Sequence, residues 1–230
     1  MTEAVLSRLR HPAGGVYDWV LEALDQSGRV LDVACGSAPS WSSVGDGWIG
    51  IDFSEAELAL ARRRGARPLV HADATALPVA TARFDTVLCL MGLMLFEPLE
   101  QAASELGRVI DAGGCLVALV PATRPVRTRD RVRYARLLAA LRRRHFAYPE
   151  DPEHIDAVLE RRGFDVVNSE RRSFRYPIDE PVHARLLIDS LYLPGTSDER
   201  VARAQVLTRR WIGTSIGVPL RRLVAVRRPV

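Results

Sequence analysis

Short apolar runs alternate with helical patterns between Val30 and Val120, and this alternation is the feature that most restricts how the chain folds. Such runs, each followed by a helix-like segment, are typical of βαβ units. The predicted strands are Val30–Val33, Trp48–Ile51, Pro68–His71, Phe84–Leu90 and Cys115–Val120. Because βαβ connections bring successive strands side by side in parallel, we expect an α/β fold with a mostly parallel sheet.

Two predicted helices connect these strands. Ser54 resembles an N-cap, and Glu57 three residues later completes a capping box for a helix that ends at Arg64, before Gly65. A second helix is predicted from Pro98 to about Ile110, after which Asp111-Ala112-Gly113-Gly114 turns the chain into the fifth strand.

The pattern changes after Pro121. Predicted helices cover Arg127–Phe146, Pro152–Arg162, Glu180–Tyr192 and Asp198–Ile216, and predicted strands cover Phe164–Arg175 and Leu223–Val226. No Gly/Ser-rich or Pro-rich linker divides the chain. We therefore expect a single domain over residues 1–230, with a core at about 28–121 and a cap with closing strands at about 122–230.

The composition fits this expectation. A chain of 230 residues with 47% hydrophobic content can bury one α/β core without disulfides or a structural metal. The first residues lack the apolar stretch of a signal peptide, and no segment reaches the roughly 18–20 apolar residues of a membrane span. Cys35, Cys89 and Cys115 lie in apolar runs without ligand spacing, which favours buried thiols. We expect a cytoplasmic protein that does not act in a membrane.

The charge is unevenly distributed. All 32 basic residues are Arg, and the formal net charge is +4. Residues 1–120 carry 9 Arg and 15 acidic residues, whereas residues 121–230 carry 23 and 13. The acidic half suits a cationic cofactor, and the basic half is expected to face something else.

Acidic residues follow three of the predicted strands. Asp32 lies in the first strand, ahead of a turn that contains Gly36; Asp52 ends the second strand, and Asp73 follows the third. The carboxyl ends of parallel strands meet at one edge of a sheet, where backbone N–H groups of a glycine turn converge on a ligand. An acid in the place of Asp52 accepts hydrogen bonds from ribose hydroxyls in dinucleotide-binding folds. The three acids indicate one nucleoside-like ligand.

Two alternatives compete with this interpretation. In the first alternative, Asp32 and Asp52 are ordinary acidic residues at strand ends and bind no ligand. In the second the ligand is a nicotinamide dinucleotide, but Gly36 lacks the second and third glycines of G-x-G-x-x-G that seat a pyrophosphate.

Four segments in order resemble the motifs of class I S-adenosylmethionine-dependent methyltransferases. Val30 to Ala38 is similar to the glycine-rich motif of that family, and Ile49-Gly50-Ile51-Asp52-Phe53-Ser54 resembles its ribose-binding strand end. The family's adenine-contacting segment and fourth strand are resembled by His71 to Pro78 and by Phe84 to Val87. Its helix and Gly-Gly turn before strand five are resembled by Glu105 to Gly114. The resemblance covers about residues 28–121.

The resemblance implies a Rossmann-like fold: a seven-stranded, mostly parallel twisted sheet with helices on both faces, an antiparallel last strand and helical cap insertions. It implies S-adenosyl-L-methionine as cofactor and S-adenosyl-L-homocysteine as product. Asp32 would then lie near the methionine ammonium, and Asp52 would hold the ribose. The other cofactor-binding positions that it implies are Ala34, Cys35, Gly36, Phe53, Asp73, Ala74, Leu90 and Met91. Two departures are Ala38 at the last glycine position and a very short helix after Pro39.

Methyl transfer needs alignment and water exclusion more than a fixed catalytic side chain, so the catalytic residue remains open. Candidate bases are His11, His145, His154, His183, Tyr17 and Tyr192. The five His residues show no ligand spacing, so no metal is expected. Tyr17, Trp41, Met94 and Phe96 are candidate walls of the acceptor pocket, and the apolar segment Met91–Phe96 favours an apolar or aromatic acceptor.

Residues 124–144 hold nine Arg and a single acid, Asp130. They fit an anionic acceptor such as RNA, or a solvated helix whose apolar face (Val132, Ala135, Leu138 and Leu141) covers the pocket as a lid. The leading hypothesis is methylation of a small molecule. RNA methylation and a non-catalytic cofactor-binding partner subunit remain alternatives, and the oligomeric state is open.

Overall fold

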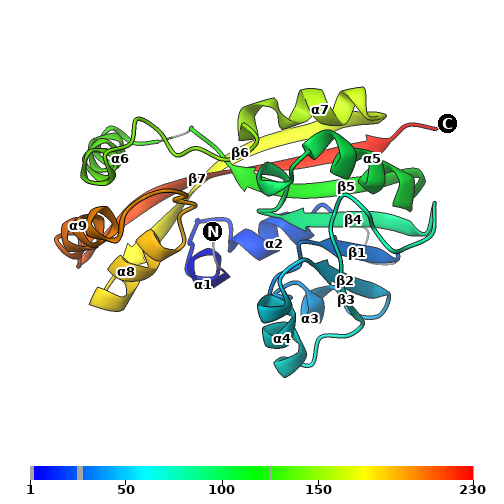
Figure 1. Ribbon diagram of the computed structural model, residues 1–230, viewed down its shortest axis with the longest axis horizontal. Helices are drawn as coiled ribbons and strands as arrows, with labels where there is room; N and C mark the ends of the chain where they lie inside the picture. The colour runs from blue at the N-terminus through cyan, green and yellow to red at the C-terminus, as the bar shows by residue number, and fades with distance from the viewer. Residues whose placement is uncertain (1–2, 25–27, 125, 230) are drawn as a thin grey trace. The chain divides into compact units, whose positions relative to one another are not determined.

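Seven strands form one sheet in the computed structural model, which describes residues 3–24, 28–124 and 126–229. The strand order is β3-β2-β1-β4-β5-β7-β6 (Figure 1). The strands are β1 Val30–Val33, β2 Trp48–Asp52, β3 Leu69–His71, β4 Phe84–Leu90, β5 Ile110–Pro121, β6 Phe164–Ile178 and β7 Thr214–Arg227. Their bounds agree closely with the predictions for the first four strands.

Strands β1 to β5 are parallel, with Val30 opposite both Trp48 of β2 and Thr86 of β4. Strand β7 runs in the opposite direction to its neighbours β5 and β6 (Figure 1). All four residues of β1 are buried, and the apolar Val30, Leu31 and Val33 fit a central parallel strand that is covered on both faces. The predicted fold class, a mostly parallel Rossmann-like sheet with an antiparallel closing strand, is confirmed.

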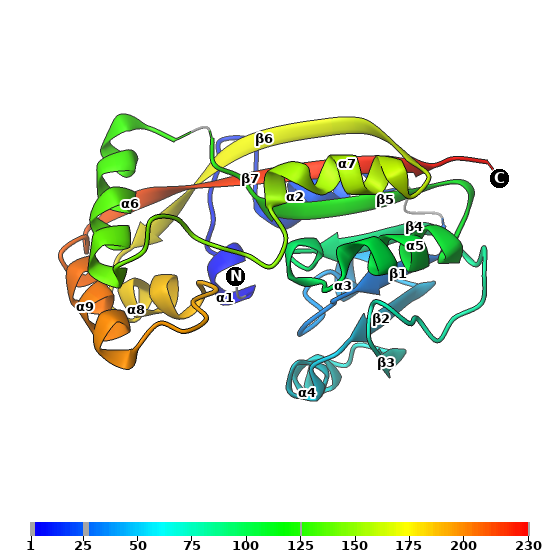
Figure 2. The same cartoon turned by 45° about the horizontal axis from the view of Figure 1, so that its top comes forward.

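Two helices of the described chain precede β1 in the sequence, and the others connect successive strands. The helices are α1 Glu3–Leu6, α2 Val16–Leu21, α3 Trp41–Val44, α4 Glu55–Arg63, α5 Leu99–Val109, α6 Thr128–Leu141, α7 Ile155–Arg161, α8 Pro181–Asp189 and α9 Asp198–Arg209, with 3₁₀ turns at Leu93–Leu95 and Pro152–His154. Helices α5 and α7 lie side by side (Figure 2). None of the helices in the described ranges has the length and hydropathy needed to span a bilayer.

Several element boundaries were predicted wrongly. Strand β5 already begins at Ile110 rather than at Cys115; β6 extends to Ile178 rather than Arg175, and α8 ends at Asp189 rather than Tyr192. The Arg-rich helix ends at Leu141 rather than Phe146, because Arg142 takes a left-handed conformation with φ 53°. Helix α9 ends at Arg209 rather than Ile216, since Gly213 donates its N–H to the carbonyl of Ile178 and begins the strand pairing. Strand β7 is therefore much longer than the predicted Leu223–Val226.

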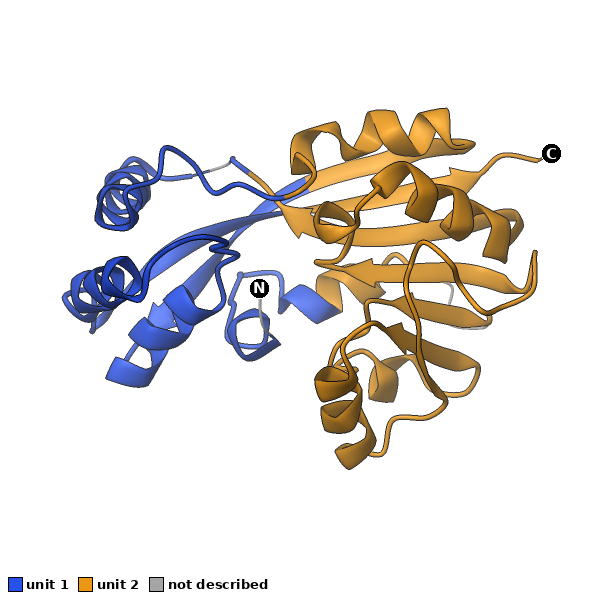
Figure 3. Cartoon of the chain, in the orientation of Figure 1, with its two compact units in different colours: residues 1–17, 123–148, 171–220 blue, residues 18–122, 149–170, 221–230 orange. Residues whose placement is uncertain are grey.

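The chain packs as two compact units, each made of three segments (Figure 3). Unit 1 comprises residues 1–17, 123–148 and 171–220, and unit 2 comprises residues 18–122, 149–170 and 221–230. Unit 2 holds β1 to β5 with α3, α4, α5 and α7; unit 1 holds α1, α6, α8 and α9. The organisation as a single domain stays a prediction.

Within unit 1, α6 packs on a face that the sequence did not predict. Val132 is 49% exposed, whereas Asp130 is 1% exposed and Leu137 and Leu141 are buried. Asp130 is ion-paired with Arg175 of β6, which compensates for its burial. Of the predicted apolar face, Leu141 is buried and Leu138 is half-buried, whereas Val132 and Ala135 are exposed, so the prediction is wrong for these two. Residue 125 of the Arg-rich segment lies outside the described residues.

Candidate functional site

The turn after β1 is held in a strained backbone conformation. Ala34, Gly36 and Ala38 have φ values of 59°, 55° and 55°, in the left-handed region that costs a non-glycine residue about 1 kcal/mol or more. Ala38 thus adopts the conformation that the glycine it replaces would favour. Among the five non-glycine residues of the described chain with positive φ, three follow β1 or β4: Ala34, Ala38 and Met91. Such strain clusters at ligand-binding sites.

Asp52 fastens this turn to the end of β2. Its Oδ2 accepts the Gly36 N–H at 2.7 Å, and its Oδ1 accepts the Ser54 N–H at 2.7 Å. Ser54 is the N-cap of α4, because its hydroxyl accepts the Glu57 N–H at 3.3 Å. The predicted capping box is wrong in its second half, since the Ser54 N–H bonds to Asp52 rather than to Glu57.

Asp32 is a buried carboxylate in which only one of the two oxygens accepts hydrogen bonds from the described residues. It is 1% exposed; its Oδ2 accepts hydrogen bonds from the Ser40 hydroxyl and, at 3.3 Å, from the Trp48 indole. Its Oδ1 is also buried and has no hydrogen-bond partner among the residues described. Burial raises the pKa of Asp32 to about 7, and the charge of Asp52 raises it further, although the hydrogen bonds from Ser40 and Trp48 lower it.

Gly50 makes the contact between Asp32 and Trp48 possible. Gly50 lies opposite Asp32 in the parallel register, and a Cβ atom on it would come within 2.3 Å of the Trp48 ring. Trp48 and Asp32 share a face of the sheet because side chains alternate with a period of two. Sequence reasoning missed Ser40 and Trp48 as partners of Asp32. Trp48 could have been predicted as a partner of Asp32, because Gly50 lies opposite Asp32 in the strand register and has no side chain to separate it from Trp48.

Phe53 and Asp73 lie beyond the ends of β2 and β3. Phe53 is 72% exposed, and its backbone carbonyl contacts Nε2 of His71 at 2.7 Å. Oδ1 of Asp73 accepts both the N–H and the hydroxyl of Thr75 at 2.8 Å, and these bonds lower the pKa of Asp73. Ala74, the next residue, is 8% exposed. The Phe53 ring contacts the His71 ring, with centroids 5.9 Å apart, and remains exposed enough for a planar base to stack on it.

The chain after β4 passes close to the turn after β1. Leu90 ends β4, and Met91, with φ 62°, donates its N–H to the carbonyl of Leu119 in β5. A Cβ atom on Gly92 would lie 2.8 Å from the Cβ of Ala34, so only glycine permits this approach. The structure thus brings the predicted positions Ala34 and Met91 to neighbouring segments.

The thiols near this edge are unreactive. Burial raises the pKa of the Cys35 and Cys89 thiols, and the charges of Asp32 and Asp52 raise both further. Free cysteines with such surroundings stay protonated and act as small apolar side chains. Cys35 therefore contributes its backbone, whose N–H donates to the carbonyl of Ile51, rather than its sulfur.

The candidate acceptor-side residues are divided between the units. Trp41, Met94 and Phe96 belong to unit 2, where Met94 is fully buried, and Tyr17 belongs to unit 1. The candidate bases His11, His145, His183 and Tyr192 belong to unit 1, and His154 to unit 2. Nδ1 of His183 accepts the Glu180 N–H at 3.2 Å and thereby caps α8. His183 therefore has a structural role, and the catalytic base stays open.

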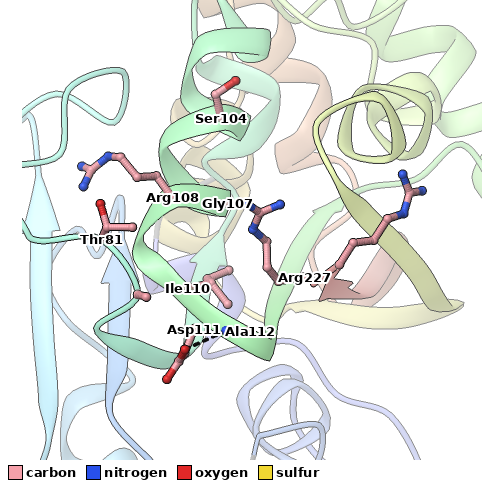
Figure 4. A pocket seen from close by; sticks show the side chains of 10 residues that line it. Thr81, Ser104, Gly107, Arg108, Ile110, Asp111, Ala112 and Arg227 are labelled. Carbon is pink, nitrogen blue, oxygen red and sulfur yellow. Dashed lines mark hydrogen bonds between the residues drawn. The ribbon is translucent and has the colours of Figure 1, made fainter. Parts of the chain in front are cut away.

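A shallow depression of about 370 Å³ lies at the opposite ends of the strands, where β4 and β5 begin (Figure 4). Its cationic side chains already have partners within the chain. Arg108 binds Glu105 and the carbonyls of Leu77 and Val79, and Arg228 binds Asp165. The depression is therefore not the predicted site. No group of three His, Cys, Asp or Glu side chains suited to a metal occurs among the described residues.

A family model described as "Methyltransferase domain" matches residues 31–118. A demethylmenaquinone methyltransferase of Thermus thermophilus is 39% identical over 101 residues, which are 40% of this chain and 46% of that protein. A malonyl-[acyl-carrier protein] O-methyltransferase of Enterobacter lignolyticus is 37% identical over 92 residues, 38% of this chain and 37% of that protein. The chain thus spans less than half the length of these curated relatives.

Solved structures share the fold over nearly the whole chain. The [4+2]-cyclase SpnF has a TM-score of 0.62 at 22% identity, covering 94% of this chain and 81% of its own. An S-adenosylmethionine-dependent methyltransferase of Thermotoga maritima has a TM-score of 0.58 at 13% identity, covering 92% and 88%. These likenesses show the fold alone. Residues 31–118 of this chain are thus similar to a methyltransferase domain, and nearly the whole chain shares the fold of these solved structures.

Proposed function

We propose that this chain binds S-adenosylmethionine at the ends of β1, β2 and β3 and transfers its methyl group to a small molecule. The observation that carries the proposal is the buried carboxylate of Asp32, whose Oδ1 has no hydrogen-bond partner among the residues described. A buried ionised acid is costly unless a cation pairs with it. The ammonium of the cofactor's methionine part supplies such a cation.

The surrounding residues fit the rest of this cofactor. Asp52 already holds the turn through the Gly36 N–H, and the remaining lone pairs of its oxygens suit the ribose hydroxyls. Phe53, 72% exposed, offers a ring for the adenine, and Asp73 and Ala74 follow the end of the neighbouring strand β3. The cofactor carries no phosphate, which agrees with a turn in which Gly36 is the only glycine between Ala34 and Ala38.

When bound, S-adenosylmethionine supplies an electrophilic methyl group on a positively charged sulfur. The chain has to orient the acceptor in line with that methyl group and exclude water. The segment Met91–Phe96 is suited to this because it is mostly buried and apolar and begins at the strained residue Met91. Any base acts only where the acceptor must lose a proton.

The acceptor is proposed to be a small apolar or aromatic molecule. Relatives matched over the cofactor half are named for demethylmenaquinone, a quinone, and for a malonyl group on a carrier protein. Their named acceptors differ, so the attacked atom is not carried over from either. The apolar segment after β4 favours a quinone-like ring over a charged metabolite.

Methyl transfer is tested with cofactor carrying a labelled methyl group and the full chain, against a panel of quinols, phenols and bulk tRNA. The proposal expects label in a small apolar acceptor. Label in tRNA alone would establish the RNA alternative, and binding without transfer to any acceptor would establish a non-catalytic subunit. Because a fold relative is a cyclase, cofactor binding alone does not count as methyl transfer.

Asp52→Ala tests the site itself. Loss of charge-assisted hydrogen bonds is expected to weaken S-adenosylmethionine binding by about 1.5–3 kcal/mol, roughly 10- to 150-fold. Asp46→Ala is the matched control, because Asp46 is an exposed acid of the preceding loop. Calorimetric titration that gives the same affinity for Asp52→Ala and for the unchanged chain would contradict the assigned role.

A further inference from the structure

Helices α6 and α9 lie side by side within unit 1 (Figures 1 and 2). A shallow groove of about 390 Å³ lies between them. The floor of this α6–α9 groove is aliphatic: Ala139 and Ala140 come from α6, and Val206 and Leu207 from α9. Val206 is 55% exposed. Unpartnered aliphatic side chains in a concave strip between helices are typical of a surface that receives another apolar face.

Arginines form the rim of the groove. Arg136 stands beside the α6 part of the floor, and Arg203 and Arg210 flank the α9 part. Within the described ranges Arg136 and Arg210 form no ion pair, and Arg203 pairs only with Glu199, at 3.4 Å and with Glu199 81% exposed. An exposed pair of this kind contributes little and is easily replaced. The rim is therefore a set of cations open to an acidic partner.

The spacing of these residues matches a helix. On α9, Arg203, Val206, Leu207 and Arg210 occupy positions i, i+3, i+4 and i+7, which lie on one face. Arg203 and Arg210 are two turns apart, about 10.5 Å at 1.5 Å per residue. Carboxylates two turns apart on a second helix have the same separation, with apolar residues between them to meet Val206 and Leu207.

Other kinds of ligand fit the groove poorly. Small-molecule sites enclose most of the ligand, whereas this groove is shallow. Single-stranded nucleic acid is held by aromatic rings on which bases stack, and none of the lining residues is aromatic. Membrane-bound surfaces insert Trp, Phe or Leu side chains, whereas the aliphatic residues of the groove are mostly Ala and Val, with Leu207 half-buried.

We propose that the α6–α9 groove is a docking site for an acidic amphipathic helix of a partner protein. The helix contacts the aliphatic floor with residues at i, i+3, i+4 and i+7, and its Glu or Asp side chains pair with the arginine rim. This gives Arg136 of the Arg-rich segment a role in protein recognition, independent of the methyl acceptor.

The probe is a fluorescein-labelled helical peptide of about 20 residues, with Leu and Ala along one face and Glu two turns apart on both flanks. Its control has the same composition with the apolar residues spread around the helix. Fluorescence anisotropy with the full chain is expected to show saturable binding of the first peptide, weaker at high salt, and at least about tenfold weaker binding of the control.

Matched variants locate the binding. Val206→Asp and Arg210→Glu are expected to raise the Kd about tenfold or more, whereas Ala202→Asp and Arg209→Glu, exposed neighbours on α9 outside the groove, change it less than about twofold. Circular dichroism should show all four variants folded, because the replaced side chains are exposed.

Three results would overturn the proposal: no saturable binding of the peptide up to about 1 mM, equal affinity for the two peptides, or equal effects of the groove variants and their controls. An RNA oligonucleotide or phosphatidylserine vesicles that bind more tightly than the peptide, and lose binding in Val206→Asp and Arg210→Glu, would overturn it as well and assign the groove to that ligand.

Discussion

Asp32→Asn removes a carboxylate that the structure buries almost completely while keeping the shape of the side chain. The Asn oxygen can still accept hydrogen bonds from Ser40 or Trp48, so the variant is expected to fold. What changes is the proton equilibrium. The charged form of Asp32 lies in an environment that disfavours it, and the pKa is raised from 3.8 to about 7.

The sign of the effect follows from that shift. A carboxyl group with a raised pKa binds its proton more tightly in the folded chain than in the unfolded chain, so folding stability falls as pH rises from about 4 to about 7. Integrated between pH 5 and pH 8, the loss of stability from Asp32 is roughly 2–3 kcal/mol. Asp32→Asn lacks this loss. The variant should therefore gain about that much stability relative to the unchanged chain over the same interval.

Cofactor binding should depend on pH in the opposite direction. If the ammonium of S-adenosylmethionine pairs with ionised Asp32, protonation at low pH competes with it. Affinity is then expected to fall about 20-fold from pH 7.5 to pH 5.5 in the unchanged chain. The ratio of the two affinities, that of the unchanged chain over that of Asp32→Asn, isolates the effect of Asp32 because every other group is common to both chains.

Urea unfolding at pH 5 and pH 8 and calorimetric titration at pH 5.5 and pH 7.5 measure these two effects. If the stability of the two chains changes with pH in the same way, the raised pKa of Asp32 in the folded chain is refuted. Parallel profiles of affinity would refute the pairing of Asp32 with the ammonium, even if the stability profiles diverge.

Three further substitutions test separate parts of the account. Phe53→Ala should leave the melting temperature within about 2 °C but weaken cofactor binding about tenfold, since the ring is 72% exposed and is proposed to stack on the adenine; unchanged affinity in a fluorescence titration would remove Phe53 from the site. Gly50→Ala should cost about 2–3 kcal/mol in urea unfolding, because its Cβ would lie 2.3 Å from the Trp48 ring; a cost below about 0.5 kcal/mol would show that the ring has room to move. Asp130→Ala should destabilise by about 3–5 kcal/mol, because it leaves the partly buried Arg175 unpaired; Asp165→Ala, which removes an exposed ion pair, is its control and should cost less than about 1 kcal/mol.

The sequence predicted the parallel part of the sheet well because those strands are specified locally. Val30–Val33 and Phe84–Leu90 are short apolar runs bounded by turns, and the structure has the same bounds. Strand β7 was largely missed because its first residues pair with β6, far away in sequence: the Gly213 N–H bonds to the Ile178 carbonyl. A local pattern carries no information about such a partner.

The same distinction applies to the site. The acids at the ends of β1, β2 and β3 were predictable from spacing, since parallel strands end at one edge. The bond of Asp52 to Gly36 and the contacts of Asp32 with Ser40 and Trp48 depend on register and on the missing side chain at Gly50. The buried face of α6 was mispredicted because Asp130 is buried and paired with Arg175 of strand β6. An acidic side chain is usually exposed to solvent.

Hydrogen exchange of the full chain, with and without S-adenosylmethionine, tests the central claim most directly. The account predicts slower exchange of the backbone amides in residues 34–38, 52–54 and 73–75, which follow β1, β2 and β3, and little change in α6 and α9. Unchanged exchange in these three segments at a saturating cofactor concentration, or protection confined to unit 1, would contradict it.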